Sequence, residues 1–415
     1  MREMDFIFER QRIAWQRGLD VLKPTQAQLE HGLELHDNLF VCDHFGFLPR
    51  SFRNKSYADK FKLLMSQGVG ARELSKQMAY QLYECTCNDE NYPDVFRRAM
   101  RNTGLNCIVH TVAEGKSREE DIKRMACNLM LFRKFRDTMA QAGSADDILE
   151  INKEGKIAVV FSVNGPPIVG ELQELEQELH WIDDWRRLGV RLMHLSYNRR
   201  NFIADGCAEK SDAGLSDLGL ELIKRLNESG IIVDVPHTGK RSSIEAAKAS
   251  TKPIMASHTA AKALFDYIRC KDDETLRAIA DTDGMVGVYA YAGLLGGDDN
   301  LNTMLDHIDH IVKVIGVDHV GIGTDGCFTP DHSPETFGLR GYENPRFDTN
   351  RWWGIWRKNP HTPKNPDESS SGSLAWSNWP LFTVGLVCRG YTDEQIAKIH
   401  GQNFLRVMRA NGCQA

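Results

Sequence analysis

The sequence lacks any apolar run long enough to cross a bilayer and any concentration of positive charge. Its 415 residues contain no uninterrupted stretch of the roughly 18 apolar residues that a membrane-spanning helix needs. The opening segment MREMDFIFERQRIAWQRG carries charges throughout, unlike a secretory signal peptide. Lys and Arg number 51 against 57 Asp and Glu, a formal net charge of -6. We therefore expect no nucleic acid and no membrane as partners.

The ten cysteines form neither a pattern of paired metal ligands nor a disulfide framework. Only Cys85 and Cys87 are closely spaced, and no second pair follows at the spacing of a zinc ribbon. In a chain of this size, scattered cysteines favour reduced thiols in a cytoplasmic protein. The sequence also lacks an internal repeat and a glycine-rich phosphate loop after its first expected strand.

What the sequence does contain is an alternation of short apolar runs with longer amphipathic segments. This alternation predicts an α/β fold whose strands pair in parallel through helical crossovers. Eight such units in roughly 300 residues have the size of a (β/α)8 TIM barrel, with a doubly wound open sheet as the alternative. The expected strands are 38–44, 104–112, 156–165, 189–198, 230–237, 252–258, 284–292 and 319–325. The expected helices between them are 68–83, 117–142, 171–187, 215–228, 240–249, 273–281 and 301–315.

The remaining segments are expected to surround this barrel. Residues 1–36 predict an N-terminal helical extension, and 37–327 the barrel itself. Residues 328–378 are rich in Pro, Ser, Asn and Trp and predict a long irregular excursion. Within it, the stretch RWWGIW favours an ordered lid or a subunit contact over a solvated linker. Residues 379–415 are expected to end the chain with helices that pack on the barrel.

Polar side chains stand where several of the expected strands end. His237, His258 and Asp325 each come at the end of an apolar run, Asn164 ends another, and Tyr197 nearly ends a fifth. In a barrel enzyme the carboxyl ends of the strands meet at one rim, which carries the active site. Two histidines from neighbouring strands with one carboxylate suit a first-row divalent metal. The pattern therefore predicts a metal site at this rim.

Other histidines fall outside this pattern. His194 lies inside the run 189–198, at an odd spacing from Tyr197, so strand alternation places the two side chains on opposite faces. We therefore do not expect both to line one pocket. The histidines expected at the surface, on or after the segment 301–315, are His307, His310 and His319.

Four segments together make the chain recognisable: GLSDLGLELIKRLNESGIIVDVPHTG, PIMASHTAAKAL, DHIDHIVKVIGVDHVGIGTDG and GYTDEQIAKIHGQNFLRVM. They resemble the renal (membrane) dipeptidase family of metallopeptidases, peptidase family M19, a branch of the amidohydrolase-like barrels. The resemblance implies two zinc ions and places His237 and His258 as ligands of one of them. It also implies that Asp325 takes a proton from the metal-bound water and that Arg269 binds the carboxylate of the substrate. The family commonly forms dimers, so we expect a homodimer.

The chain departs from this family on the first strand, where ligands of the other metal would stand. The family opens with Asp-Gly-His-x-Asp-x-Pro, and this chain has DHFGFLP. Aligned without a gap, Phe45 and Phe47 take the two ligand positions. Shifted by one residue, His44 becomes the ligand while Gly46 replaces the aspartate. In either alignment a carboxylate is missing.

Two further departures affect the third and fourth strands of the barrel. Asn164 replaces the bridging glutamate of the family, and a neutral amide is a weak ligand that cannot bridge two dications. Tyr197 replaces a histidine that contacts the tetrahedral intermediate. We predict Tyr197 as catalytic, Asn164 as substrate-binding, and one divalent ion per chain, with zinc favoured over iron or manganese. The predicted ligands of this ion are His237, His258, Asp325 and His44, with His110 as a further candidate.

These features predict a divergent dipeptidase-like, metal-dependent hydrolase that cleaves an amide or related C–N bond of a small-molecule substrate. The ion would acidify a water molecule and Asp325 would accept the proton. Two alternatives stay open. Two histidines with a carboxylate resemble the ligands of mononuclear non-haem iron enzymes, so the barrel would suit an oxygenase or lyase in a pocket made apolar by Phe45, Phe47 and Tyr197. The other alternative is a catalytically inactive protein on the same fold.

Overall fold

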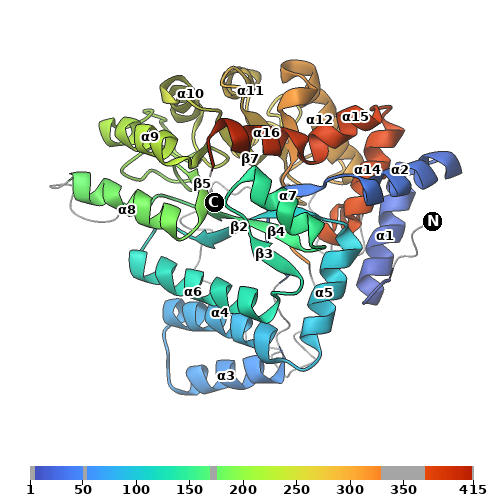
Figure 1. Cartoon of the computed structure of the whole chain (residues 1–415), viewed down its shortest axis with the longest axis horizontal. Coiled ribbons are helices and arrows are strands. Elements are labelled where there is room, and N and C mark those ends of the chain that lie inside the picture. Colours follow the sequence, from blue (N-terminus) through green and yellow to red (C-terminus); the bar gives the residue numbers. More distant parts are fainter. Residues whose placement is uncertain (1–4, 50–53, 169–174, 329–369, 414–415) are drawn as a thin grey trace.

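The computed structural model describes residues 5–49, 54–168, 175–328 and 370–413, and in these ranges a parallel sheet curves into a nearly closed (β/α)8 barrel (Figure 1). The strands run around the barrel in the order β1-β2-β4-β5-β6-β7-β8-β9, and β3 pairs in parallel with the first residues of β4, off this path. The strands are β1 Cys42–Gly46, β2 Cys107–Ala113, β3 Met139–Gln141, β4 Ile157–Val163, β5 Val190–His194, β6 Ile232–Asp234, β7 Met255–Thr259, β8 Met285–Val288 and β9 Val320–Ile322.

Helices enclose the barrel and cover one of its ends. Successive crossover helices surround the sheet, while the N-terminal and C-terminal helices lie side by side, α14 against α2 and α1 (Figure 1). The helices before β5 are α1 Glu9–Leu22, α2 Gln26–Asn38, α3 Lys55–Ser66, α4 Ala71–Asn88, α5 Tyr92–Thr103, α6 Arg118–Lys134, α7 Ala145–Lys153 and α8 Leu175–Arg187. The later helices are α9 Asp217–Ser229, α10 Lys240–Ala249, α11 Asp273–Ala280, α12 Leu301–Ile315, α14 Trp379–Cys388, α15 Asp393–Ala397 and α16 Asn403–Ala410, with short 3-10 turns η1 Val317–His319, η4 Ser370–Leu374 and η5 Trp376–Asn378 and a π-helical turn η6 Lys398–Gln402.

The expected barrel is confirmed, with corrections to single elements. The expected helix 117–142 is shorter, because α6 ends at Lys134 and the chain then enters β3, whose flanking backbone bonds to β4. His307 is buried rather than at the surface, since its ring bonds to the Ala261 amide and the Leu295 carbonyl. Of the expected excursion 328–378, most lies outside the described residues; its end forms η4 and η5.

The first and last barrel strands meet through backbone groups just beyond their ends. The amide of Asp325 donates to the carbonyl of Phe45 over 2.8 Å, and the amide of Phe47 donates to the carbonyl of Gly326 over 2.9 Å. Asp325 itself has a φ of 52°, a left-handed conformation that an aspartate tolerates better than most residues. The turn after β9 therefore joins the barrel and fixes Asp325 at its rim.

The opposite end of the barrel is closed by α16. Arg406 donates to the Asp318 carbonyl and Asn411 to the Pro253 carbonyl, both of which precede strands. Phe404 and Met408 pack into one cluster with the side chains that line the lower barrel interior. The rim where the strands end is therefore the end that α16 leaves open to carry a site.

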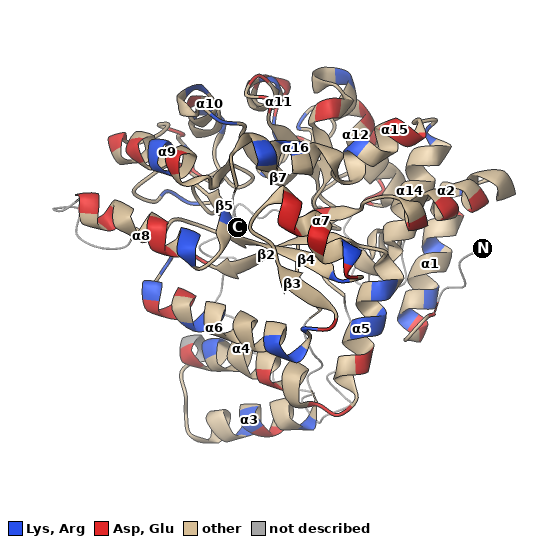
Figure 2. Cartoon of the chain, viewed as in Figure 1, with Lys and Arg blue, Asp and Glu red and all other residues tan. Residues whose placement is uncertain are grey.

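The outer surface carries charges of both signs. Lys and Arg are interspersed with Asp and Glu over the outer helices in the view of Figure 2. Among the helices of the described residues, none is both long and apolar enough to cross a membrane.

Candidate active site

Two histidines face each other at the rim. His258 lies within β7 and His237 follows β6, and their Nε2 atoms are 3.0 Å apart. Nδ1 of His237 lies 2.6 Å from Oδ1 of Asn198, and an amide oxygen only accepts, so this Nδ1 carries the proton. Nε2 of His237 is then unprotonated, and its lone pair is directed towards Nε2 of His258 and Nη2 of Arg269. Nδ1 of His258 is held by the Ser257 hydroxyl at 2.9 Å.

Glycines on the neighbouring strands make room for the backbone that carries His258. A Cβ atom on Gly287 or Gly323 would come within 2.0 or 2.1 Å of the Ser257 carbonyl oxygen. Glycine is therefore needed at position 287 in β8 and at position 323, directly after β9, where the backbone of β7 comes close. This close approach places the His258 ring at the open end of the barrel.

Aromatic rings enclose the histidine pair on both sides. Phe45 stacks on His258 with ring centroids 3.9 Å apart, and Tyr197 stacks on His237 at 4.1 Å. His194 lies about equally far from both, with its ring centroid 5.5 Å from that of His237 and 5.6 Å from that of His258. His194 and Tyr197 thus contact the same histidine, contrary to the expectation from strand alternation. The reason is that β5 ends at His194, so alternation no longer governs Tyr197.

Buried cations adjoin the pair. The guanidinium of Arg269, which is 1% exposed, donates to the Pro236 carbonyl, and its Nη2 lies 3.3 Å from Nε2 of His237. Lys271 is 4% exposed, and burial lowers its pKa to about 8. Burial, and after it the charge of Arg269, lowers the pKa of both His237 and His258 well below the usual value. Both rings are therefore neutral at pH 7, the form in which imidazole binds metals.

Asp325 stands at the same rim, where it lines the adjoining cavity. Its side chain makes no hydrogen bond within the described residues, although its backbone is fixed at the seam between β9 and β1. Burial raises its pKa to about 6, and the charges of Arg269 and His194 oppose this shift. Near neutral pH the carboxylate is mainly ionised and remains basic enough to accept a proton.

The structure does not bring His44 to the histidine pair. Its ring packs against Phe404 of α16 at a centroid distance of 5.5 Å and occupies the space that Gly321 leaves, where a Cβ atom would come within 2.3 Å. Burial lowers the pKa of His44 to about 3. Phe45, by contrast, faces His258. This arrangement matches the ungapped alignment of the first strand, and we leave His44 out of the proposed site.

Asn164 and His110 are held by neighbours of their own. Nδ2 of Asn164 donates to Oε2 of Glu114 over 3.0 Å, and Glu114 in turn pairs with Arg124. His110 accepts from the Leu48 amide and lies 3.0 Å from Oδ1 of Asn128. Both side chains are therefore held by residues other than the histidine pair.

Asp43, next to His44, has become a structural junction. Its carboxylate accepts hydrogen bonds from the Thr324 amide at 2.9 Å, the Thr324 hydroxyl at 2.6 Å and the Trp376 indole at 3.1 Å. Despite these donors, burial raises its pKa to about 7. Asp43 thus ties β1 to the turn after β9 and to η5.

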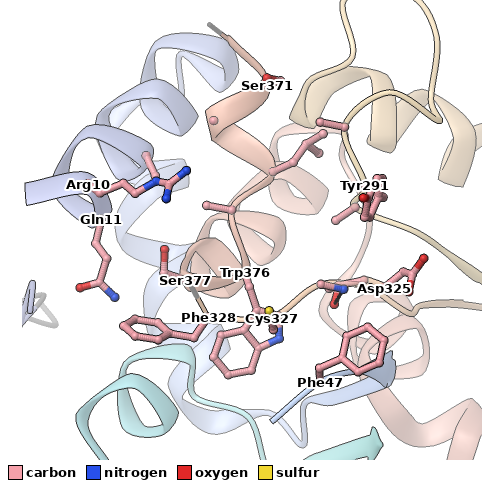
Figure 3. Close-up of a pocket in the computed structure, with 18 of the residues that line it drawn as sticks. Arg10, Gln11, Phe47, Tyr291, Asp325, Cys327, Phe328, Ser371, Trp376 and Ser377 are labelled. Carbon is pink, nitrogen blue, oxygen red and sulfur yellow. Dashed lines mark hydrogen bonds between the residues drawn. The ribbon is translucent and has the colours of Figure 1, made fainter. Parts of the chain in front are cut away.

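A cavity of about 490 Å³ opens beside this rim. Figure 3 shows Asp325, Tyr291 and Phe47 on one side of it, Trp376 and Phe328 along its floor, and Arg10 with Gln11 of α1 on the opposite side. Phe47 also contacts Phe45, with ring centroids 5.7 Å apart, and so connects the cavity wall to the ring stacked on His258.

The comparisons with known proteins agree with this architecture. The family model of membrane dipeptidase (peptidase family M19) matches residues 71–333. The chain belongs to this family. It is 26% identical to dipeptidase tcpJ of Claviceps purpurea over 66% of this chain and 56% of that protein. It is 33% identical to the uncharacterized dipeptidase C3A11.10c of Schizosaccharomyces pombe over 54% of this chain and 47% of that protein.

A solved structure extends the likeness to almost the whole fold. An amidohydrolase from Pseudomonas aeruginosa aligns with a TM-score of 0.65 and 24% identity, covering 92% of this chain and 98% of the other. At that identity the likeness supports the barrel fold alone. The chain spans about half to three fifths of the length of the curated relatives that it matches.

Membership of the M19 family implies a divalent metal, and the residues at the rim fit one ion better than two. Two imidazole nitrogens bound to one tetrahedral zinc stand roughly 3.3 Å apart, and the two Nε2 atoms here are separated by 3.0 Å. Phe45 and Phe47 bring no ligand atom to the first strand. Within the described ranges, no three His, Cys, Asp or Glu side chains form a group that would hold a metal. Asp325 lines the cavity at this rim, and its predicted roles as a metal ligand and as a proton acceptor stay predictions.

Several residues that shape this site escaped the sequence reasoning. Asn198 fixes the tautomer of His237, Ser257 holds His258, and Asp234 places its Oδ2 3.1 Å from Nε2 of His194. Their only sequence signal was a polar residue close to a predicted site residue: Asn198 is next to Tyr197, Ser257 is next to His258, and Asp234 lies three positions before His237. Trp376 carried no such signal, because its partner Asp43 is 333 residues away.

Proposed function

We propose that this chain is a dipeptidase-like hydrolase that cleaves an amide or related C–N bond of a small molecule with one divalent ion. The observation that carries the proposal is the opposed pair of neutral imidazole nitrogens, 3.0 Å apart, at the rim that also presents Asp325. Zinc is the favoured ion, with iron and manganese as alternatives. Because the matched relatives are longer than the aligned region, their activity supports the proposal without establishing it.

His237 and His258 would hold the ion through their Nε2 atoms. An ion held there supplies a Lewis acid that makes water more acidic and polarises a carbonyl. Asn198 keeps the proton of His237 on Nδ1, and the stacked ring of Tyr197 fixes its plane. The geometry thus supports a role for Tyr197 in orienting His237, which is a proposed metal ligand.

Asp325 is the proposed proton acceptor. Its carboxylate lines the cavity, free of hydrogen bonds from the described residues, and would take a proton from the attacking water. It would then return that proton to the leaving nitrogen. Phe45 and Phe47 keep bulk water from the inner face of the pair.

Arg269 and Asn164 stay predictions as substrate-binding residues. The Arg269 donors are directed to backbone carbonyls and to His237, and the Asn164 amide to Glu114. Either side chain would have to exchange these partners to reach a substrate. The geometry supports Arg269 more directly as a group that keeps His237 neutral.

The apolar surroundings of the pair also favour a second candidate, an oxygenase or lyase with a single iron on the same ligands. Three aromatic rings, Phe45, Phe47 and Tyr197, adjoin the site, and such dry surroundings suit chemistry from which water is excluded. Oxygen consumption that depends on tightly bound iron would favour this candidate over hydrolysis.

Metal analysis combined with a hydrolysis assay tests the proposal. We expect about one ion per chain in protein purified without chelators, and amine release from dipeptides that EDTA abolishes and added zinc restores. His237→Ala should lose both the ion and the activity, whereas His310→Gln, on the outer helix α12, should keep both. Two ions per chain, or dipeptide cleavage that persists without any metal, would contradict the single-ion site.

The expected homodimer is tested by light scattering of the same sample.

A further inference from the structure

The cavity beside Asp325 is lined by an unusual concentration of aromatic rings. Phe47, Tyr291, Phe328 and Trp376 reach it from four separate segments: the end of β1, the loop after β8, the turn after β9, and η5 (Figure 3). Its volume of about 490 Å³ lies in the range of small-molecule pockets. Flat rings facing a common space favour a flat apolar group by stacking and by removing its surface from water.

The two ends of the cavity differ in charge. Among the described residues that line it, Arg10 is the one cationic side chain and Asp325 the one anionic side chain. The neighbour of Arg10, Gln11, already accepts from the Ile7 amide at 2.8 Å and the Phe8 amide at 3.2 Å. Arg10 is the cationic side chain at this end of the cavity among the described residues, and a guanidinium suits a carboxylate.

The wall that faces these charges is held in place by Asp43. The indole nitrogen of Trp376 donates to Oδ2 of Asp43, the same oxygen that accepts from the Thr324 hydroxyl. Trp376 is 4% exposed, and its ring is thereby fixed relative to the turn that carries Asp325. A rigid aromatic wall at a set position selects by shape rather than by adapting to its ligand.

We propose that this cavity binds amides of carboxylic acids that carry a bulky aromatic group, such as aromatic amino-acid derivatives. The scissile amide lies at the Asp325 end, the aromatic group packs against Trp376 and Phe47, and the carboxylate meets Arg10. This substrate class rests on the proposed function, because it takes Asp325 as the reacting end. Dipeptides of small residues would leave the aromatic wall uncovered.

Binding of the probe 1-naphthylacetate to the full chain, measured by calorimetry, tests the proposal without turnover. We expect it to bind at least tenfold more tightly than acetate and than the neutral probe 1-naphthylmethanol. Ala292→Phe, which adds a ring to the cavity lining, should weaken naphthylacetate binding at least tenfold. Arg10→Met should remove the advantage of naphthylacetate over naphthylmethanol. Arg12→Met is the matched control, because Arg12 pairs with Glu9 and is not among the lining residues.

Ile13→Phe is a second cavity-filling variant, used with thermal melts to separate misfolding from lost binding. Equal binding of naphthylacetate and acetate, or full binding in both filled variants, would overturn the proposed substrate class. The outcome is separable from that of the hydrolase proposal. If the chain binds the probe but cleaves no amide, the proposed ligand class of the cavity holds and the proposed hydrolase activity is wrong. If the chain hydrolyses small dipeptides but does not bind the probe, the hydrolase activity holds and the ligand class is wrong.

Discussion

The two sides of the barrel mouth present different kinds of side chain. On the β6–β7 side, His237 and His258 present opposed ring nitrogens and each has a partner that fixes its other nitrogen. On the β1–β4 side, Phe45 and Phe47 are aromatic and the Asn164 amide is bound to Glu114. The difference teaches that one side of a barrel mouth can carry aromatic and neutral side chains while its strands stay joined. The reason is that backbone bonds, such as Asp325 to Phe45, join the strands at that side.

The largest effect is expected when either histidine of the β6–β7 side is replaced. His237→Ala and His258→Ala should each lower metal content to near zero and hydrolysis by at least ~1,000-fold, since the ion depends on both imidazoles. His44→Gln should keep its metal, because His44 packs on Phe404 away from the pair. Metal loss in the folded His44→Gln protein would show that the two sides are not separate.

A second test separates ion binding from proton transfer. Asp325→Asn keeps the size of the side chain but removes its basicity, so hydrolysis should fall by roughly 100- to 10,000-fold. Metal content should stay unchanged, because Asp325 does not join a ligand group in the described residues. Element analysis and steady-state kinetics on the same preparation check both statements. Loss of metal in this variant would make Asp325 a ligand.

A third test tries to rebuild the altered side. Phe45→His, Phe47→Asp and Asn164→Glu together restore the ligand types at the positions given by the ungapped alignment. We expect the metal content to rise from one to two ions per chain, because carboxylates then offset the second dication. Metal analysis after circular dichroism has shown folding checks this. A folded triple variant that still holds one ion would mean that more than these residues separates the two sides.

The smallest expected effect concerns Asp43, which joins β1 to the turn after β9 and to η5. Burial raises the pKa of Asp43 from 3.8 to about 7, so the folded protein holds this proton more tightly than the unfolded chain. The stabilisation is full below about pH 4 and is lost as the pH rises to 7, at up to about 1.4 kcal/mol per pH unit. Asp43→Asn should flatten this dependence in urea unfolding at pH 5 and pH 7.5. An unchanged slope, alongside the surface control Asp393→Asn, would contradict the shift.

The barrel and the histidine pair were predictable from the sequence because each depends on local signals. Apolar runs marked the eight strands, and His258 lies within β7 where such a run ends. β3 was missed because three residues carry little pattern of their own and are held by pairing with β4. The helices α3 and α5 lie between β1 and β2, where no apolar run divided the segment.

The remainder of the site depends on contacts between distant segments. The anchoring role of Asp43 had no local signal, because its partners Thr324 and Trp376 lie 281 and 333 residues further along the chain. The choice between His44 and Phe45 could not be made from spacing alone, because it depends on the room that Gly321 leaves. The cavity is likewise assembled from α1, η5 and three strand ends, and no single stretch of sequence describes it.

The hydrogen bond from the Asp325 amide to the Phe45 carbonyl makes the position of Asp325 depend on closure of the barrel. The two residues are 280 positions apart, and the hydrogen bond forms only when the last strand has come back to the first. A partly synthesised or partly unwound chain has no fixed acid at its mouth. In a partly denatured sample, the rate of turnover would therefore be proportional to the number of molecules whose barrel is closed. During refolding, activity would return with the pairing of the last strand to the first, not with the earlier folding steps.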